Sequence, residues 1–73
     1  MYTKLIYKSH RKAPDGFHDV ITCIKKGWFS EKEVTFYGNC TVWFTHDPFQ
    51  RCDSFTERKL TDIWMMLKVK GEL

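Results

Sequence analysis

The chain has 73 residues, a formal net charge of +3 and an aromatic share of 16%. This length fits one domain near the lower size limit for a stable core, so we expect a single domain over residues 1–73. No apolar run approaches the roughly 18 residues that a membrane-spanning helix needs, and no repeat or low-complexity tract is present. We therefore expect a compact domain that has no membrane partner.

The N-terminus and the cysteines indicate a compartment. The first apolar run, in MYTKLIYK, is short and contains two lysines, unlike the apolar stretch of a signal peptide. The three cysteines, Cys23, Cys40 and Cys52, form an odd set without the spacing of a small disulfide protein. Since the chain also starts with methionine, we expect a complete small gene product that is cytoplasmic and keeps its thiols reduced.

Residues 2–8 and 17–26 have the pattern of two antiparallel strands. Side chains alternate between two faces in the first stretch, and the second is rich in β-branched and aromatic residues. The sequence Ala-Pro-Asp-Gly at 13–16 is typical of a turn, because proline presets φ and glycine adopts conformations that other residues avoid. These features predict a β-hairpin at the start of the chain.

A second hairpin is predicted over residues 33–46, EVTFYGNCTVWFTH. Gly38 and Asn39 lie between two strand-like runs, which is typical of a two-residue hairpin loop. In that register one face of the hairpin carries Val34, Phe36 and Trp43, and the other carries Tyr37, Cys40, Val42 and Phe44. Both faces are apolar enough to be buried, and the alternation alone leaves the choice open.

The last third of the chain predicts a loop followed by a helix. Asp47-Pro48 ends the preceding strand, and Ser54-Phe-Thr-Glu57 matches a capping box ahead of a helix over 55–69. An apolar stripe follows at helical spacing, formed by Leu60, Ile63, Trp64 and Leu67. The expected fold is α+β, a small antiparallel sheet of about four strands in two hairpins with one C-terminal helix packed across it.

This helix carries more apolar residues than one buried stripe requires. Met65 and Val69 fall on the side opposite Leu60 at 100° per residue. Either the last turn frays or is covered by the loop at 47–53, with Phe49 over it, or an exposed apolar strip binds a partner. We favour a binding strip, with Trp28 at the end of a strand as a second anchor. The predicted partner-binding residues are Trp28, Met65, Met66, Lys68, Val69 and Lys70.

A basic N-terminal hairpin supports an alternative, direct binding of RNA or DNA. Lysines on a strand face together with a basic hairpin loop can contact phosphates. The residues in this alternative are Lys4, Lys8, His10, Arg11 and Lys12. An acidic middle segment weakens it, because that segment would repel a polyanion.

Catalytic and metal-binding patterns are lacking in the sequence. Cys40, His46 and Cys52 are six residues apart, without the close chelating pair of a structural zinc site. There is no glycine-rich phosphate loop and no nucleophile elbow. We therefore expect no enzyme, metal or cofactor.

The predicted function is that of a small regulatory or inhibitory protein that binds a larger protein or complex. The charge pattern leans toward machinery that handles nucleic acid, such as the transcription apparatus. A homodimer formed through the helix or an edge strand stays open.

Overall fold

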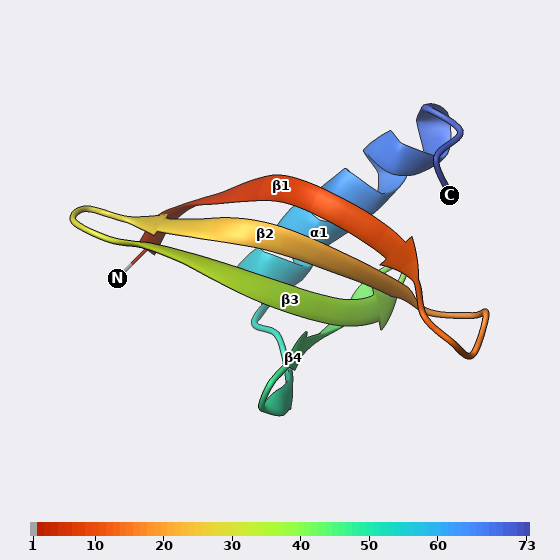
Figure 1. Ribbon diagram of the computed structural model, residues 1–73, viewed down its shortest axis with the longest axis horizontal. Coiled ribbons are helices and arrows are strands. Elements are labelled where there is room, and N and C mark those ends of the chain that lie inside the picture. Colours follow the sequence, from red (N-terminus) through yellow and green to blue (C-terminus); the bar gives the residue numbers. More distant parts are fainter. Residues whose placement is uncertain (1) are drawn as a thin grey trace.

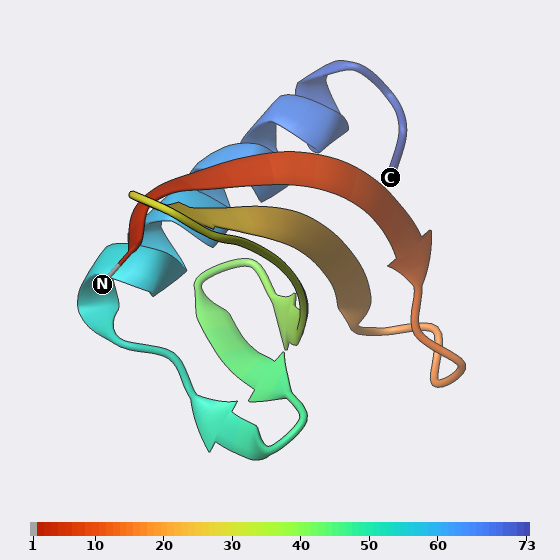
Figure 2. The ribbon, with the colours of Figure 1, turned by 60° about the vertical axis from the view of Figure 1, so that its left-hand side comes forward.

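The structure, a computed structural model, describes residues 2–73 and forms one sheet and one helix (Figure 1). The strands and the helix are β1 (Tyr2–Lys12), β2 (Asp19–Gly27), β3 (Glu31–Asn39), β4 (Val42–His46), β5 (Phe49–Arg51) and α1 (Ser54–Val69). The strands follow one another in the sheet in chain order, and all neighbours are antiparallel. In Figure 2, β4 and β5 lie on the inner side of the curve made by β1–β3. The helix is too short and too polar to cross a membrane.

The α+β fold with a C-terminal helix is confirmed, but the sheet has one strand more than expected. Phe49–Arg51, which was predicted to be a loop, forms β5 and pairs with β4. Pro48 lies in the turn between them, where its missing N–H removes no ladder hydrogen bond. Three residues are too few to show an alternating pattern, so this strand has no signal in the sequence.

The predicted register of the β3–β4 hairpin is wrong. Asn39 pairs with Val42, so the turn residues are Cys40 and Thr41, and Cys40 takes a positive φ of 54°. Gly38 is a strand residue opposite Trp43. A Cβ atom at Gly38 would lie 2.6 Å from a carbon of the Trp43 ring, so glycine is needed here for close packing rather than for a turn.

The buried face of this hairpin is the one that carries Phe36 and Trp43. The Trp43 side chain is fully buried (0% exposed), whereas Val42 and Cys40 are exposed. Cys40, which the predicted register places in a strand, therefore lies in the turn and at the surface. The core side chains come from the sheet and α1 together: Leu5, Ile21, Cys23, Phe36, Trp43, Cys52, Leu60 and Leu67.

The start of α1 is capped by Asp53 and not by Ser54 as predicted. The Asp53 side chain accepts a hydrogen bond of 2.7 Å from the Thr56 N–H. Glu57 does not close a capping box. Its carboxylate accepts a 3.0 Å hydrogen bond from the Trp43 N–H and pairs with Arg51. The first turn of the helix is therefore fastened to β4 and β5.

The middle of α1 is held against β1 and β2 through Asp19, which is 1% exposed. Its carboxylate accepts a 2.9 Å hydrogen bond from Trp64 Nε1, lies 2.8 Å from His10 Nε2 and accepts a 3.2 Å bond from Lys12. Burial raises the pKa of Asp19, but the hydrogen bonds from His10, Trp64 and Lys12 outweigh burial and lower it overall. Asp19 thereby joins β1, β2 and α1 and sets which side of the helix faces the sheet.

Candidate protein-interaction surface

The outward side of α1 carries three exposed apolar side chains near its C-terminal end. Met65 is 52% exposed, Met66 37% and Val69 85%, whereas Leu60 and Leu67 on the opposite side are buried. The predicted exposure of Met65 and Val69 is thus confirmed. We call Met65, Met66 and Val69, with the flanking Lys68 and Lys70, the helix surface.

The loop that could have covered this surface lies elsewhere. The ring of Phe49 stacks on Phe44 in the sheet, with ring centroids 4.7 Å apart, and does not lie over α1. Since the Asp19–Trp64 hydrogen bond and the burial of Leu67 fix the rotation of the helix, Met65 has no place in the core. The exposure of the helix surface therefore follows from the contacts that hold α1 against the sheet.

Two lysines border the helix surface at the negative end of the helix dipole. Lys68 Nζ lies 5.1 Å from the centre of the Trp64 ring, a cation–π distance, and Lys70 is the C-cap residue. Within residues 2–73, neither ammonium group is paired with a carboxylate. The helix surface therefore combines apolar area with a positive border.

Trp28 does not join this surface. It lies in the turn between β2 and β3, at the left end of the long axis in Figure 1, whereas the C-terminal end of α1 lies on the right. Trp28 is 79% exposed, and its neighbour Phe29 is 98% exposed. The sequence prediction missed Phe29, although a Trp-Phe pair directly after Gly27 was a usable signal for an aromatic hairpin tip.

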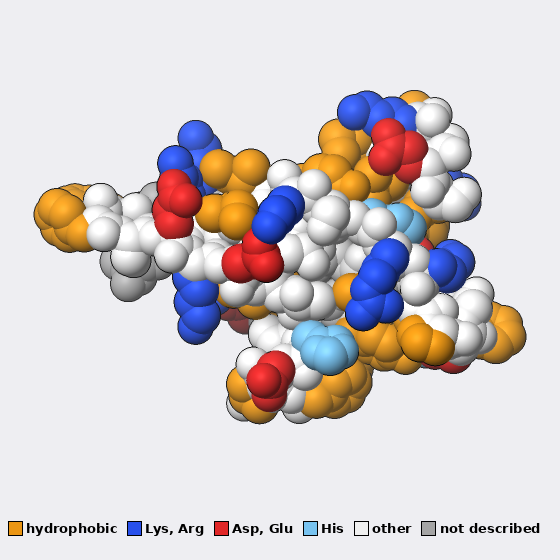
Figure 3. Space-filling view, viewed as in Figure 1, with side chains coloured by type: hydrophobic (Ala, Val, Ile, Leu, Met, Phe, Trp, Pro, Cys, Tyr) orange, Lys and Arg blue, Asp and Glu red, His pale blue; other side chains and the backbone are white. Residues whose placement is uncertain are grey.

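The five residues of the nucleic-acid alternative do not form one basic patch. His10, Arg11 and Lys12 were expected in a hairpin loop, but they belong to β1, which runs to Lys12. His10 and Lys12 both contact Asp19, and Lys8 is paired with Glu33. On the sheet face seen in Figure 3, blue lysine and arginine side chains are interspersed with red acidic ones.

Lys4 and Arg11, the remaining two residues of that set, lie at opposite ends of β1. Lys4 is opposite Lys26, and Arg11 is opposite Val20. The two residues are seven positions apart along the strand, a distance of roughly 23 Å at about 3.3 Å per residue. A nucleic-acid strand would therefore meet two separate cations rather than a continuous track.

A polar and aromatic cluster that the sequence analysis missed lies at the β1–β2 loop. Asp15 accepts hydrogen bonds from the backbone N–H groups of Phe17 and His18, lies 2.6 Å from His18 Nδ1 and accepts a 2.9 Å bond from the Tyr37 hydroxyl. These backbone and side-chain hydrogen bonds lower the pKa of Asp15, and the bond to Asp15 raises the pKa of Tyr37. The His18 ring stacks on Tyr37. The cluster fastens the loop to β3.

The three cysteines have free thiols, two of them in the core and the third, Cys40, at the surface. Cys23 and Cys52 are buried, and burial raises the pKa of each thiol to about 11. In the part of the chain that the structure describes, no group of three or more His, Cys, Asp or Glu side chains is arranged to hold a metal ion.

Comparison with protein-family models, with curated proteins and with solved structures gives no match to this chain.

Proposed function

We propose that this protein is a small regulatory or inhibitory protein that acts by binding a larger protein or complex through its helix surface. The observation that supports this best is the outward exposure of Met65 and Val69 on a helix whose opposite side is buried. Contiguous apolar area on the surface of a small protein is typical of an interface.

The chemistry of the helix surface favours a protein as its partner. Methionine adapts to an irregular partner surface because its side chain is unbranched and its sulfur is polarizable. Phosphate groups could contact only Lys68 and Lys70 on this surface, and apolar side chains separate the two lysines. The partner we propose has an apolar groove with carboxylates at its edge. A protein bound in that groove would prevent other ligands of the partner from binding there.

Changing Met65 and Val69 together to lysine is expected to abolish partner binding while leaving the fold intact. Both side chains are exposed, so the free energy of unfolding should change by less than about 1 kcal/mol for the pair. Two charges in the centre of an apolar interface should weaken binding more than about tenfold. The measurement is recovery of the partner from nuclease-treated host extract by wild-type and variant protein, with urea unfolding of both.

Phe17→Lys is the matched control, because Phe17 is an exposed apolar residue outside the helix surface. It should bind the partner as the wild type does. If the Met65/Val69 variant unfolds, those residues belong to the core and the proposal is wrong. If recovery depends on nucleic acid and falls steeply with salt, the RNA- or DNA-binding alternative replaces it.

A further inference from the structure

The turn between β2 and β3 forms a second, separate surface at the other end of the molecule. The turn is closed by a hydrogen bond of 2.8 Å from the Gly27 N–H to the Ser30 carbonyl oxygen. This bond leaves Trp28 and Phe29 at the tip, where both rings are exposed to solvent. We call Trp28 and Phe29 the aromatic tip.

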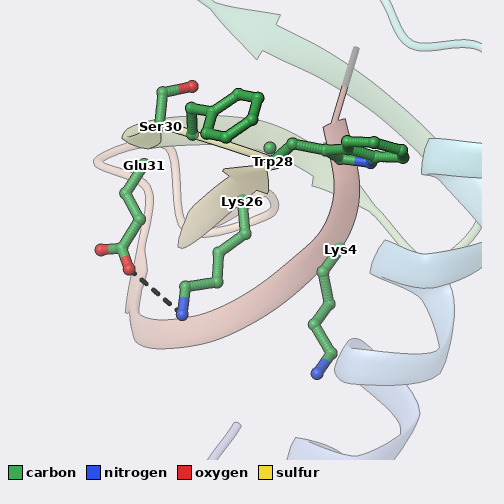
Figure 4. A pocket seen from close by; sticks show the side chains of 7 residues that line it. Lys4, Lys26, Trp28, Ser30 and Glu31 are labelled. Carbon is green, nitrogen blue, oxygen red and sulfur yellow. Dashed lines mark ion pairs between the residues drawn. The ribbon is translucent and has the colours of Figure 1, made fainter.

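An open hollow of about 450 Å³ lies beside the aromatic tip (Figure 4). Its lining comes from the turn and from the adjoining ends of β1, β2 and β3: Lys4, Lys26, Gly27, Trp28, Phe29, Ser30 and Glu31. Figure 4 shows the side chains of Lys4 and Lys26 extending in the same direction from neighbouring strands, whereas Trp28 lies on the other side of the hollow, away from their ammonium groups. One wall of the hollow is therefore aromatic and another is cationic.

Lysines occupy directly opposite positions on both faces of the sheet behind the aromatic tip. Lys4 is the cross-strand partner of Lys26, and Lys25 is the cross-strand partner of Lys32. Consecutive strand residues point to opposite faces, so one pair lies on each face. Like charges at directly opposite positions repel each other across a sheet. The carboxylate of Glu31 lies 3.1 Å from Lys26 Nζ.

We propose that the aromatic tip and its hollow bind an acidic segment of a protein partner, one that carries a carboxylate next to an apolar side chain. The carboxylate would meet Lys4, which makes no ion pair within residues 2–73, and the apolar side chain would pack on Trp28. This site goes beyond the helix surface and does not depend on it, because the two lie at opposite ends of the molecule.

Shape and charge favour a protein segment over other anionic partners. A polypeptide can enter the hollow while its neighbouring residues cover the aromatic tip, whereas a flat lipid surface would leave the hollow empty. A stacked nucleic-acid base would cover only one face of a ring. Almost the whole surface of Phe29 is exposed, and a polypeptide can cover more of it than one base can. Glu31 in the lining would repel closely spaced phosphates, whereas a protein segment can place a hydrogen-bond donor against it.

The test is selection of a displayed random-peptide library against the full chain, with the Trp28→Ser/Phe29→Ser variant for counter-selection. We expect the enriched peptides to combine Asp or Glu with an aromatic or aliphatic residue. A synthetic peptide of the enriched sequence should lose more than about tenfold in affinity for the Trp28/Phe29 variant. It should also bind Lys4→Glu more weakly than Lys59→Glu, which makes the same charge change on α1.

The controls separate this site from the helix surface and from other ligands. The Met65→Lys/Val69→Lys variant should bind the selected peptide as tightly as the wild type. The proposal is overturned if the enriched peptides lack acidic residues or bind the Trp28/Phe29 variant equally well. It is also overturned if oligo(dT), or vesicles containing phosphatidylserine, bind in place of the peptides and lose affinity on the same substitutions.

Discussion

Replacing Gly38 with alanine is expected to destabilise the protein by more than about 3 kcal/mol, the upper end of what overpacking usually costs. The added Cβ atom would lie 2.2 Å from the carbonyl oxygen of Val42 and 2.6 Å from the Trp43 ring. The oxygen belongs to the backbone of the paired strand, so the clash can be relieved only by moving β4. A domain of this size has about 3–5 kcal/mol of stability, so most or all of that stability should be lost.

The measurement is urea unfolding followed by tryptophan fluorescence. Gly71→Ala serves as the matched control, because Gly71 has a φ of 76° but nothing lies within 4 Å of an added Cβ atom. That change should cost only the strain of a left-handed backbone, about 1–2 kcal/mol. A loss of less than about 1 kcal/mol for Gly38→Ala would mean that Trp43 does not pack against Gly38 as described.

Asp19→Ala is expected to cost about 2–3 kcal/mol, because it removes a buried acceptor of hydrogen bonds and leaves partly buried donors without a partner. The substitution leaves the Trp64 indole N–H without its acceptor and leaves His10 and Lys12 without their carboxylate. Asp19→Asn should cost less, because the amide oxygen can still accept the bond from Trp64. Urea unfolding at neutral pH measures both, and a cost below about 1 kcal/mol for Asp19→Ala would contradict the role given to this carboxylate.

The same carboxylate predicts how wild-type stability depends on pH. Because the pKa of Asp19 is lower in the folded protein than the ordinary value of 3.8, its contribution is complete above that value and is lost as pH falls below it. Asp53 and Glu57 have lowered pKa values for similar reasons and act in the same direction. The urea midpoint should fall as the pH decreases below about 4, and the fall should be smaller in Asp19→Ala.

The elements that could be predicted from the sequence were those with local signals. The helix at 54–69 was predicted to within one residue, because its apolar stripe spans several turns and Gly71 follows it. The β3–β4 register was missed because Gly38 has two uses, in a turn and beneath a large ring, and only the packing of Trp43 distinguishes them. The short β5 forms through pairing with β4, and a stretch of three residues is too short for its sequence to predict that pairing.

The candidate surfaces divide in the same way. Helical periodicity places Met65 and Val69 opposite the buried stripe, but it left open whether the loop at 47–53 covers them. Their exposure also depends on Phe49, which stacks on Phe44 in the sheet. The pairing of His10 and Lys12 with Asp19 could not be predicted from the sequence, because the hairpin brings Asp19 next to them. Asp19 is also hydrogen-bonded to Trp64, which is far along the chain. Charges counted along a sequence do not reveal which of them are neutralised in the fold.

Hydroxyl-radical footprinting of the protein, free and bound to its recovered partner, tests the central claim most directly. The side chains of Met65, Met66 and Val69 should react readily in the free protein and become strongly protected in the complex. Phe17, which is exposed in another part of the molecule, should react equally in both. If Met65 and Met66 stay reactive in the complex while protection maps to β1 or the β1–β2 loop, α1 does not form the interface.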